Sequence, residues 1–207
     1  MLRKAVAVVV AVAALGLAGC SKPASPAAGP TPDVSREFTV PPTAVVSADL
    51  ARTLSSAHAA TAKYANDIGA AQKDGYMIIT GMMPGMGYHY LNPNIQGFNP
   101  TQPDILVYNR AGNSDHLVAL EWVFTEKPKI APLEGATYGS FDAACHYRDG
   151  SFTPAAAEKD CAKTSPQSGS PFNFWHPTLV TLHVWLWYDN PAGLFNSTNP
   201  LVGPATS

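Results

Sequence analysis

The sequence is poor in charged residues and contains no cluster of lysine and arginine. Only 14% of its 207 residues are charged, and the formal net charge is −2, whereas an ordinary soluble domain has about 25% charged residues. Proteins that bind nucleic acid neutralise phosphates with clustered cations. The scattered basic residues therefore argue against a nucleic-acid partner.

Local motifs of the common catalytic sites are also absent. The chain has no HExxH pair of zinc-binding histidines and no Gly-x-Ser-x-Gly nucleophile turn. The glycine-rich segment 81–87 lacks the lysine and the following helix that a phosphate-binding loop needs. The sequence therefore identifies no reaction, and it leaves open whether the protein is an enzyme.

The N-terminus has the features of a lipoprotein signal peptide. A basic start, Met1–Lys4, precedes an uncharged run over 5–17, which is shorter than the about 20 residues of a spanning helix. The run ends in Leu17-Ala18-Gly19-Cys20, which resembles the bacterial lipobox. We expect cleavage of residues 1–19 and lipidation of Cys20 by diacylglycerol and palmitate-like chains, although an ordinary secretory signal with a chance cysteine is the alternative.

A lipidated cysteine would hold the protein on a membrane without a transmembrane helix. The predicted location is extracytoplasmic, on the cell membrane or the outer membrane. Residues 20–37 are rich in serine, proline, alanine and glycine, which predicts a disordered tether because such a composition cannot bury enough apolar surface to fold. Residues 38–207 are then expected to form a single globular domain.

Two cysteines, Cys145 and Cys161, remain once Cys20 is lipidated. In an oxidising compartment we expect them to form a disulfide, with two free thiols as the alternative. In the chain-entropy model, closing a loop of this size contributes roughly 3 kcal/mol to stability.

The hydrophobic pattern predicts an α+β fold. Apolar residues recur at spacings of four and three over 47–74, which is typical of one long amphipathic helix capped by Ser47. Downstream, short apolar runs separated by Gly, Asn and Pro turns predict strands over 76–80, 88–91, 104–109, 117–125 and 178–188. We expect the long N-terminal helix to pack on a small, mostly antiparallel sheet or a partly closed barrel.

The last predicted strand places an imidazole among aromatic rings. Because side chains alternate between the two faces of a strand, His183 shares a face with Thr181, Trp185 and Trp187. A face of this composition resembles the wall of a pocket. Tyr90, from the second predicted strand, is expected to line the same pocket.

Two more polar residues stand out in apolar strands. Glu121 is the only charge in Leu117–Phe124, and His89 lies between two tyrosines. Two imidazoles and a carboxylate are a common ligand set for a divalent transition metal. We therefore predict a metal site of His89, Glu121 and His183, with His176 as a possible fourth ligand; the alternative is three hydrogen-bonded polar residues in a partly buried sheet.

Two segments resemble a family of uncharacterised bacterial secreted proteins and lipoproteins. Gly85–Pro93 resembles its GMGxHYxNP motif, and the segment from His183 to Phe195 resembles its HxWLWxxNPxGxF motif. The resemblance implies no activity. It points to the same polar residues, since a strand with a lone glutamate, matched by Glu121, lies between the two motifs.

The sequence is compatible with three hypotheses about function. The first is a lipoprotein that binds a metal ion or small ligand in a pocket lined by His, Glu and Trp. The second is a structural or interaction protein of the cell envelope, which predicts an exposed apolar patch with Trp175 or Trp187. The third is an enzyme that uses the same site, with Glu121 as general base.

Overall fold

The computed structural model describes residues 46–203. The expected signal peptide, Cys20, the tether and the start of the predicted domain lie outside the described residues. Within 46–203, no helix is long and apolar enough to cross a membrane.

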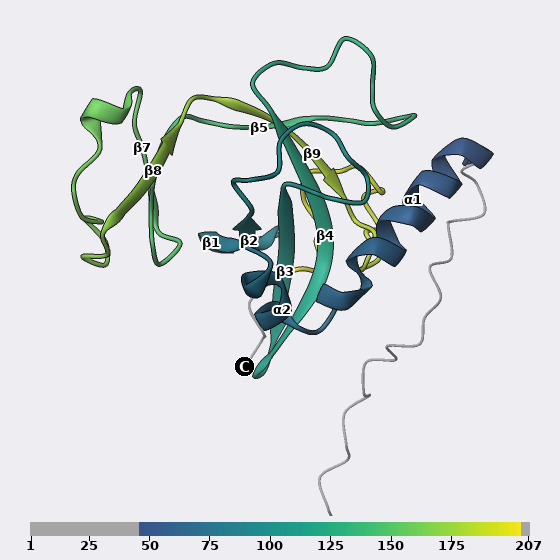
Figure 1. The fold of residues 1–207 in the computed structure, drawn as a ribbon, viewed down its shortest axis with the longest axis horizontal. Helices are drawn as coiled ribbons and strands as arrows, with labels where there is room; N and C mark the ends of the chain where they lie inside the picture. Colours follow the sequence, from purple (N-terminus) through teal and green to yellow (C-terminus); the bar gives the residue numbers. More distant parts are fainter. Residues whose placement is uncertain (1–45, 204–207) are drawn as a thin grey trace, which may run out of the picture. The chain divides into compact units, whose positions relative to one another are not determined.

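The main element of the fold is a curled antiparallel sheet of six strands, in the order β1-β2-β3-β4-β9-β5. Its longest strand, β4, lies near the middle beside β3 and β9 (Figure 1). The bounds are Met77–Met83 (β1), Gly87–Leu91 (β2), Ile105–Ala111 (β3), Ser114–Phe124 (β4), Gly139–Phe141 (β5) and Leu179–Val184 (β9). The mixed, mostly β architecture and the half-closed barrel agree with the predicted fold class.

A second sheet holds three short strands in the order β7-β6-β8. They are Ala144–Tyr147 (β6), Phe152–Pro154 (β7) and Phe172–His176 (β8), and a 3-10 turn, η2, covers Glu158–Asp160. The predicted disulfide is confirmed here: Cys145 of β6 is joined to Cys161, with 5.6 Å between their Cα atoms.

The prediction of one long N-terminal helix is wrong. The structure has α1 (Ala48–Thr61), a 3-10 turn η1 (Ala62–Tyr64) and a separate short helix α2 (Ile68–Lys73). The backbone leaves the helix because its carbonyls bind the sheet: Leu117 donates its N–H to the Ala65 oxygen, and the Tyr108 hydroxyl donates to the Tyr64 oxygen. The Asp67 side chain then caps α2 by accepting the N–H of Ala70.

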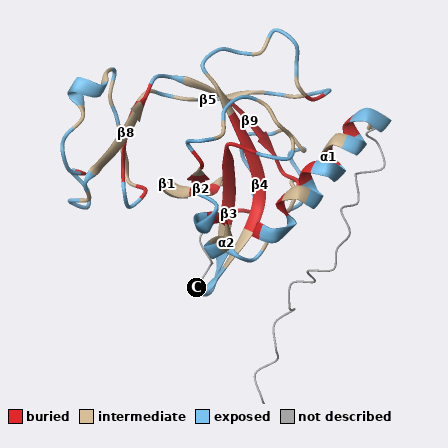
Figure 2. Ribbon diagram, in the orientation of Figure 1, coloured by how far each residue is buried: buried red, intermediate tan, exposed pale blue. Residues whose placement is uncertain are grey.

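The two faces of the main sheet bury different sets of side chains, and the red ribbons of Figure 2 show that β3, β4 and β9 form the centre of the core. One face packs against α1 and includes Leu106, Leu120 and Leu182. The opposite face includes Val107, Ala119 and Trp185. Side-chain alternation thus separates a helix-side core from the face that carries the three predicted metal ligands.

Candidate metal centre

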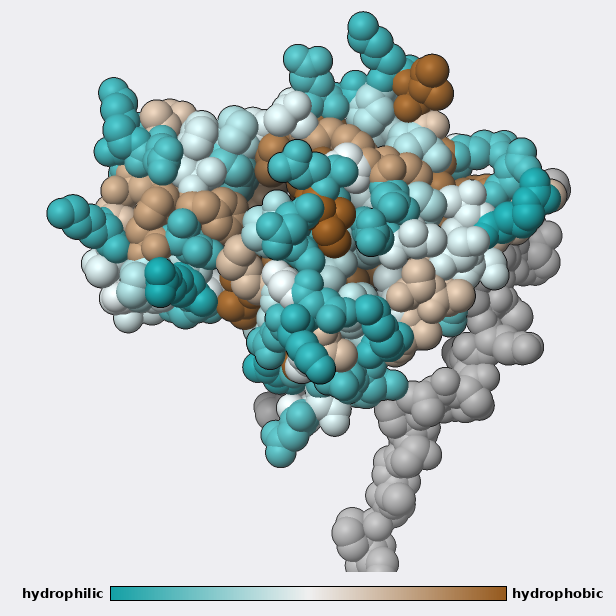
Figure 3. All heavy atoms as spheres, viewed as in Figure 1, coloured by the Kyte–Doolittle hydropathy of each residue, from teal (hydrophilic) through white to brown (hydrophobic). Residues whose placement is uncertain are grey.

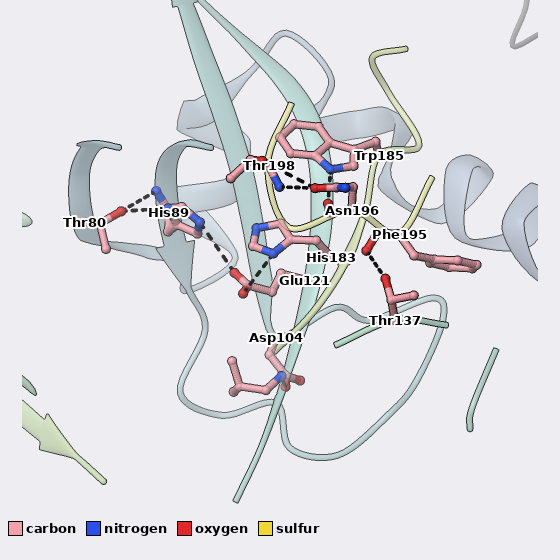
Figure 4. A network of polar contacts seen from close by, with 11 residues as sticks. Thr80, His89, Asp104, Glu121, Thr137, His183, Trp185, Phe195, Asn196 and Thr198 are labelled. Atoms are coloured by element: carbon pink, nitrogen blue, oxygen red, sulfur yellow. Dashed lines mark hydrogen bonds and ion pairs between the residues drawn. The ribbon is translucent and has the colours of Figure 1, made fainter. Parts of the chain in front are cut away.

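His89, Glu121 and His183 lie together on the face of the sheet opposite α1. Glu121 of β4 is paired directly with His183 of β9. His89 lies two strands away from Glu121, on β2. It is paired with Val107 of β3, and Val107 is paired with Ala119 of β4. Figure 4 shows both imidazoles pointing toward the carboxylate of Glu121.

The ligand atoms of the three side chains form a small cluster. His89 Nε2 is 3.6 Å from Glu121 Oε2, and His183 Nδ1 is 3.4 Å from Glu121 Oε1. One potential ligand atom from each residue lies within 4.8 Å of those of the other two. This buried group can therefore hold a metal ion.

These separations fit coordination better than hydrogen bonding. Charge-assisted N–H···O bonds are about 2.7–2.9 Å long, which is shorter than both observed distances. Two ligands placed about 2.0–2.1 Å from a tetrahedral zinc ion are about 3.3–3.4 Å apart. The imidazole–carboxylate pairs lie near that value, and a short inward movement of the two imidazoles would complete the set.

Neither ring nitrogen of His183 has a hydrogen-bond partner, although the residue is only 2% exposed. A neutral imidazole has one N–H donor and one acceptor, and leaving such groups unsatisfied in the interior costs about 1–3 kcal/mol. An ion bound at Nδ1 would use the lone pair that faces Glu121. The missing partners are thus the strongest local indication of a ligand.

His89 is held in position by its other nitrogen. The Nδ1 atom is 2.7 Å from the Thr80 hydroxyl oxygen, which also accepts the backbone N–H of His89. Metal-binding histidines commonly use the second nitrogen in this way, and that contact fixes the ring orientation. The Nε2 atom is consequently the one directed at Glu121. Thr80 was missed by the sequence analysis because strict alternation puts it on the face of Ile78, in the helix-side core. A register shift in β1 between Ile78 and Thr80 pairs Thr80 with His89 instead.

A glycine next to the site sets the path of β2. Gly87 has φ of +109°, and a Cβ atom there would overlap the carbonyl oxygen of Tyr108 on β3. The close approach of the two backbones is possible only without a side chain. Gly87 therefore holds β2 against β3 two residues before His89.

Burial shifts the titration of all three residues toward their neutral forms. It raises the pKa of Glu121 to about 8, assisted by the nearby charge of Asp104 and opposed by the Thr181 hydroxyl. It lowers the pKa of His89 to about 4 and that of His183 to about 3. At neutral pH the metal-free cluster thus holds a protonated carboxyl and two neutral imidazoles, and a bound cation would replace the proton.

Only one of the expected pocket aromatics lies at the cluster. The indole of Trp185 is nearly parallel to the His183 ring, with 5.9 Å between centroids, and its Nε1 donates to Asn196 O at 2.6 Å. Tyr90 faces the helix-side core and contacts Tyr108 edge-on. Trp187 is on that side too, stacked on His58 of α1.

The predicted strand over 178–188 is too long, which explains the placement of Trp187. The strand β9 ends at Val184, and the next residues turn: Trp185 N–H bonds to Leu194 O and Leu186 N–H to Val184 O. The turn brings the Trp187 side chain to α1, where its Nε1 donates to the Thr61 hydroxyl. Tyr90 is on the other face simply because it follows His89 in β2.

His176 is not a fourth ligand. It ends β8 in the second sheet, and its Nε2 lies 2.9 Å from Nε2 of His146. Its Nδ1 donates to the carbonyl of Pro177. Both ring nitrogens are thus engaged away from Glu121.

Asp104 is a further buried carboxyl that the sequence analysis did not select. Its Oδ2 accepts the N–H of Val123, whereas Oδ1 has no partner. Burial raises its pKa to about 6. Asp104 and Val123 also line an open pocket of about 590 Å³ that includes none of the three clustered residues. The sequence feature that could have identified Asp104 is its position as the only acidic residue at the start of an apolar strand.

Comparisons of the chain with protein-family models, with curated proteins and with solved structures found no match.

Proposed function

We propose that this protein is a membrane-anchored extracytoplasmic lipoprotein that binds one divalent transition metal ion. The ligands are Nε2 of His89, the carboxylate of Glu121 and Nδ1 of His183. The observation that carries the proposal is the pair of unsatisfied His183 nitrogens beside a buried carboxyl. The lipid anchor on Cys20 rests on the N-terminal sequence alone.

The donor set favours zinc or a similar ion. Imidazole nitrogen and carboxylate oxygen suit borderline cations such as Zn²⁺, and two histidines with one carboxylate are an established zinc set. Without an ion, ionising Glu121 leaves a buried negative charge with no cation beside it, which is costly. A bound divalent ion compensates that charge and uses the lone pairs of His89 Nε2 and His183 Nδ1.

The enclosure of the site bears on what the ion does. His89, Glu121 and His183 are 4%, 3% and 2% exposed, so a large substrate has no direct contact with the ion. This favours holding the ion, as a store, a carrier or a structural centre, over turnover of a bulky substrate. We therefore rank metal binding above catalysis.

The interaction alternative predicted an exposed patch with Trp175 or Trp187. Both indoles are half-buried and use their N–H groups internally, Trp175 to Ala155 O and Trp187 to Thr61 Oγ1. In residues 46–203 the exposed large hydrophobics are Ile130, Tyr188 and Leu201. The face in Figure 3 shows its brown residues in small groups among teal and white ones. Trp175 and Trp187 therefore do not form the exposed patch that this alternative predicted.

Metal content tests the proposal. The purified protein is loaded with Zn²⁺, passed over a desalting column and analysed by mass spectrometry of the elements. We expect one zinc per chain for the wild type and for His116→Ala, which removes a histidine outside the site. His89→Ala, His183→Ala and Glu121→Gln should each lose most of the bound zinc. Equal and negligible zinc in all five proteins would overturn the proposal.

A further inference from the structure

A second pair of histidines lies in the three-stranded sheet, separate from the three metal ligands. His146 of β6 is fully buried, and His176 at the end of β8 is 8% exposed. Their Nε2 atoms face each other at 2.9 Å. The two residues occupy adjacent antiparallel strands in which Ala144 is paired with His176 and His146 with Phe174.

The remaining ring nitrogens fix the positions of two hydrogens. His146 Nδ1 is 2.7 Å from the carbonyl oxygen of Ile79, and His176 Nδ1 is 2.6 Å from that of Pro177. A carbonyl oxygen only accepts, so both Nδ1 atoms must carry hydrogen. A neutral imidazole has a single N–H, and two neutral rings would therefore oppose two lone pairs across 2.9 Å. A positive species between the Nε2 atoms removes this conflict.

The surroundings favour a proton over a metal ion. Within 46–203, no third His, Cys, Asp or Glu joins the pair to complete a ligand set. Two nitrogens on a tetrahedral zinc ion would be about 3.3 Å apart, further than observed. The lining is aromatic: Phe174 stacks on His146 with 4.7 Å between centroids, Phe152 stacks at 5.6 Å, and Phe141 contacts both histidines.

This aromatic cage suits a single diffuse charge. Aromatic faces stabilise a cation near them, whereas a divalent ion without an anionic partner is strongly disfavoured in the interior. Burial lowers the pKa of His146 to about 4 and also lowers that of His176, which opposes charging either ring, so the two opposed Nε2 atoms must supply the affinity for the shared proton. Outside the pair, the nearby His146 contributes to the lowered pKa of His89 on β2.

We infer that His146 and His176 bind one proton between their Nε2 atoms and form an imidazole–imidazolium pair. The shared proton links β6 to β8. The same His146 ring donates to Ile79 of β1, and Gly81 N–H bonds to Gly150 O beside it. The pair thus fastens the second sheet to the main sheet, and loss of the proton would leave two opposed lone pairs and weaken that attachment.

Nuclear magnetic resonance of the ¹⁵N-labelled protein tests the inference. We expect one strongly deshielded hydrogen that couples to both Nε2 nuclei, and a single one-proton step that moves both rings together as the pH rises. Two independent titrations, or no shared hydrogen at any pH at which the protein is folded, would overturn the proposal. Displacement of the shared hydrogen by stoichiometric Zn²⁺ or Cu⁺ would overturn it in favour of a metal site.

A substitution adds a second readout. In His176→Gln the amide N–H can donate to His146 Nε2, which replaces the charged link with a neutral one. We expect this variant to lose the shared-hydrogen signal and the one-proton step, while His116→Gln keeps both. Retention of the one-proton step in His176→Gln would contradict the proposal, and the wild-type spectrum decides the matter if that variant does not fold.

Discussion

Zinc affinity should depend on pH through a single proton. Because burial raises the pKa of Glu121 to about 8, the metal-free carboxyl is protonated at neutral pH, and the ion must displace that proton. The two imidazoles are already neutral above pH 4, since their pKa values are about 4 and about 3. One proton is therefore released per ion between pH 4 and pH 8.

The magnitude follows from that count. Well below the pKa of Glu121, release of one proton makes the apparent association constant rise about tenfold per pH unit. Because the carboxyl is half ionised at its pKa of about 8, affinity should increase about 50-fold between pH 6 and pH 8 and level off above that pH. Calorimetry in two buffers of different ionisation enthalpy counts the protons, and competition with a chromophoric chelator measures the constant.

Glu121→Gln serves as the control for the source of the proton. This variant keeps the shape of the side chain but has no proton to release, so its weaker residual binding should be independent of pH over the same range. If the logarithm of the wild-type association constant did not change with pH (a slope of zero), Glu121 would be ionised in the metal-free protein. A slope of two would mean that an imidazole is protonated as well, and either result would refute the electrostatic reasoning.

Three further outcomes are expected. Thr80→Val removes the hydroxyl that orients His89 and should weaken zinc binding by about 10–100-fold, measured by chelator competition. Gly87→Ala forces a side chain into a backbone of positive φ and against Tyr108 O, which should lower the free energy of unfolding by about 1–3 kcal/mol in a denaturant titration, whereas Gly81→Ala, with open space around it, should not. The unreduced, unfolded protein should show no reactive thiol from Cys145 and Cys161, and replacing both with serine should cost about 3 kcal/mol of stability; two reactive thiols per chain would contradict the disulfide.

The sequence predicted the parts of the fold that depend on local periodicity. Alternation placed His183 on the same face as Trp185, and in the structure both lie on the face opposite the helix-side core. The prediction of a single helix over 47–74 was wrong because the apolar stripe in the sequence continues through the segment between α1 and α2, where the helix is interrupted. The break is caused by hydrogen bonds from Leu117 and Tyr108 to carbonyls of η1 and the residue after it, and such tertiary contacts leave no local pattern.

The candidate site was predictable only as a set of residue types. His89, Glu121 and His183 each stood out as polar residues in apolar strands, but their convergence depends on the strand order β2-β3-β4-β9. Trp187 was misplaced because the turn after Val184 cannot be read from alternation. His176 was misplaced because nothing in the sequence assigned it to a second sheet.

The most direct test of the metal site is to locate the ion itself. A crystal of the zinc-loaded protein, with anomalous diffraction collected at the zinc absorption edge, gives the position and the ligands of the ion. We predict one zinc about 2.0–2.1 Å from Nε2 of His89 and Nδ1 of His183 and about 2.0–2.2 Å from a carboxylate oxygen of Glu121. An anomalous peak elsewhere, or loaded protein with no peak between these three side chains, would contradict the proposal.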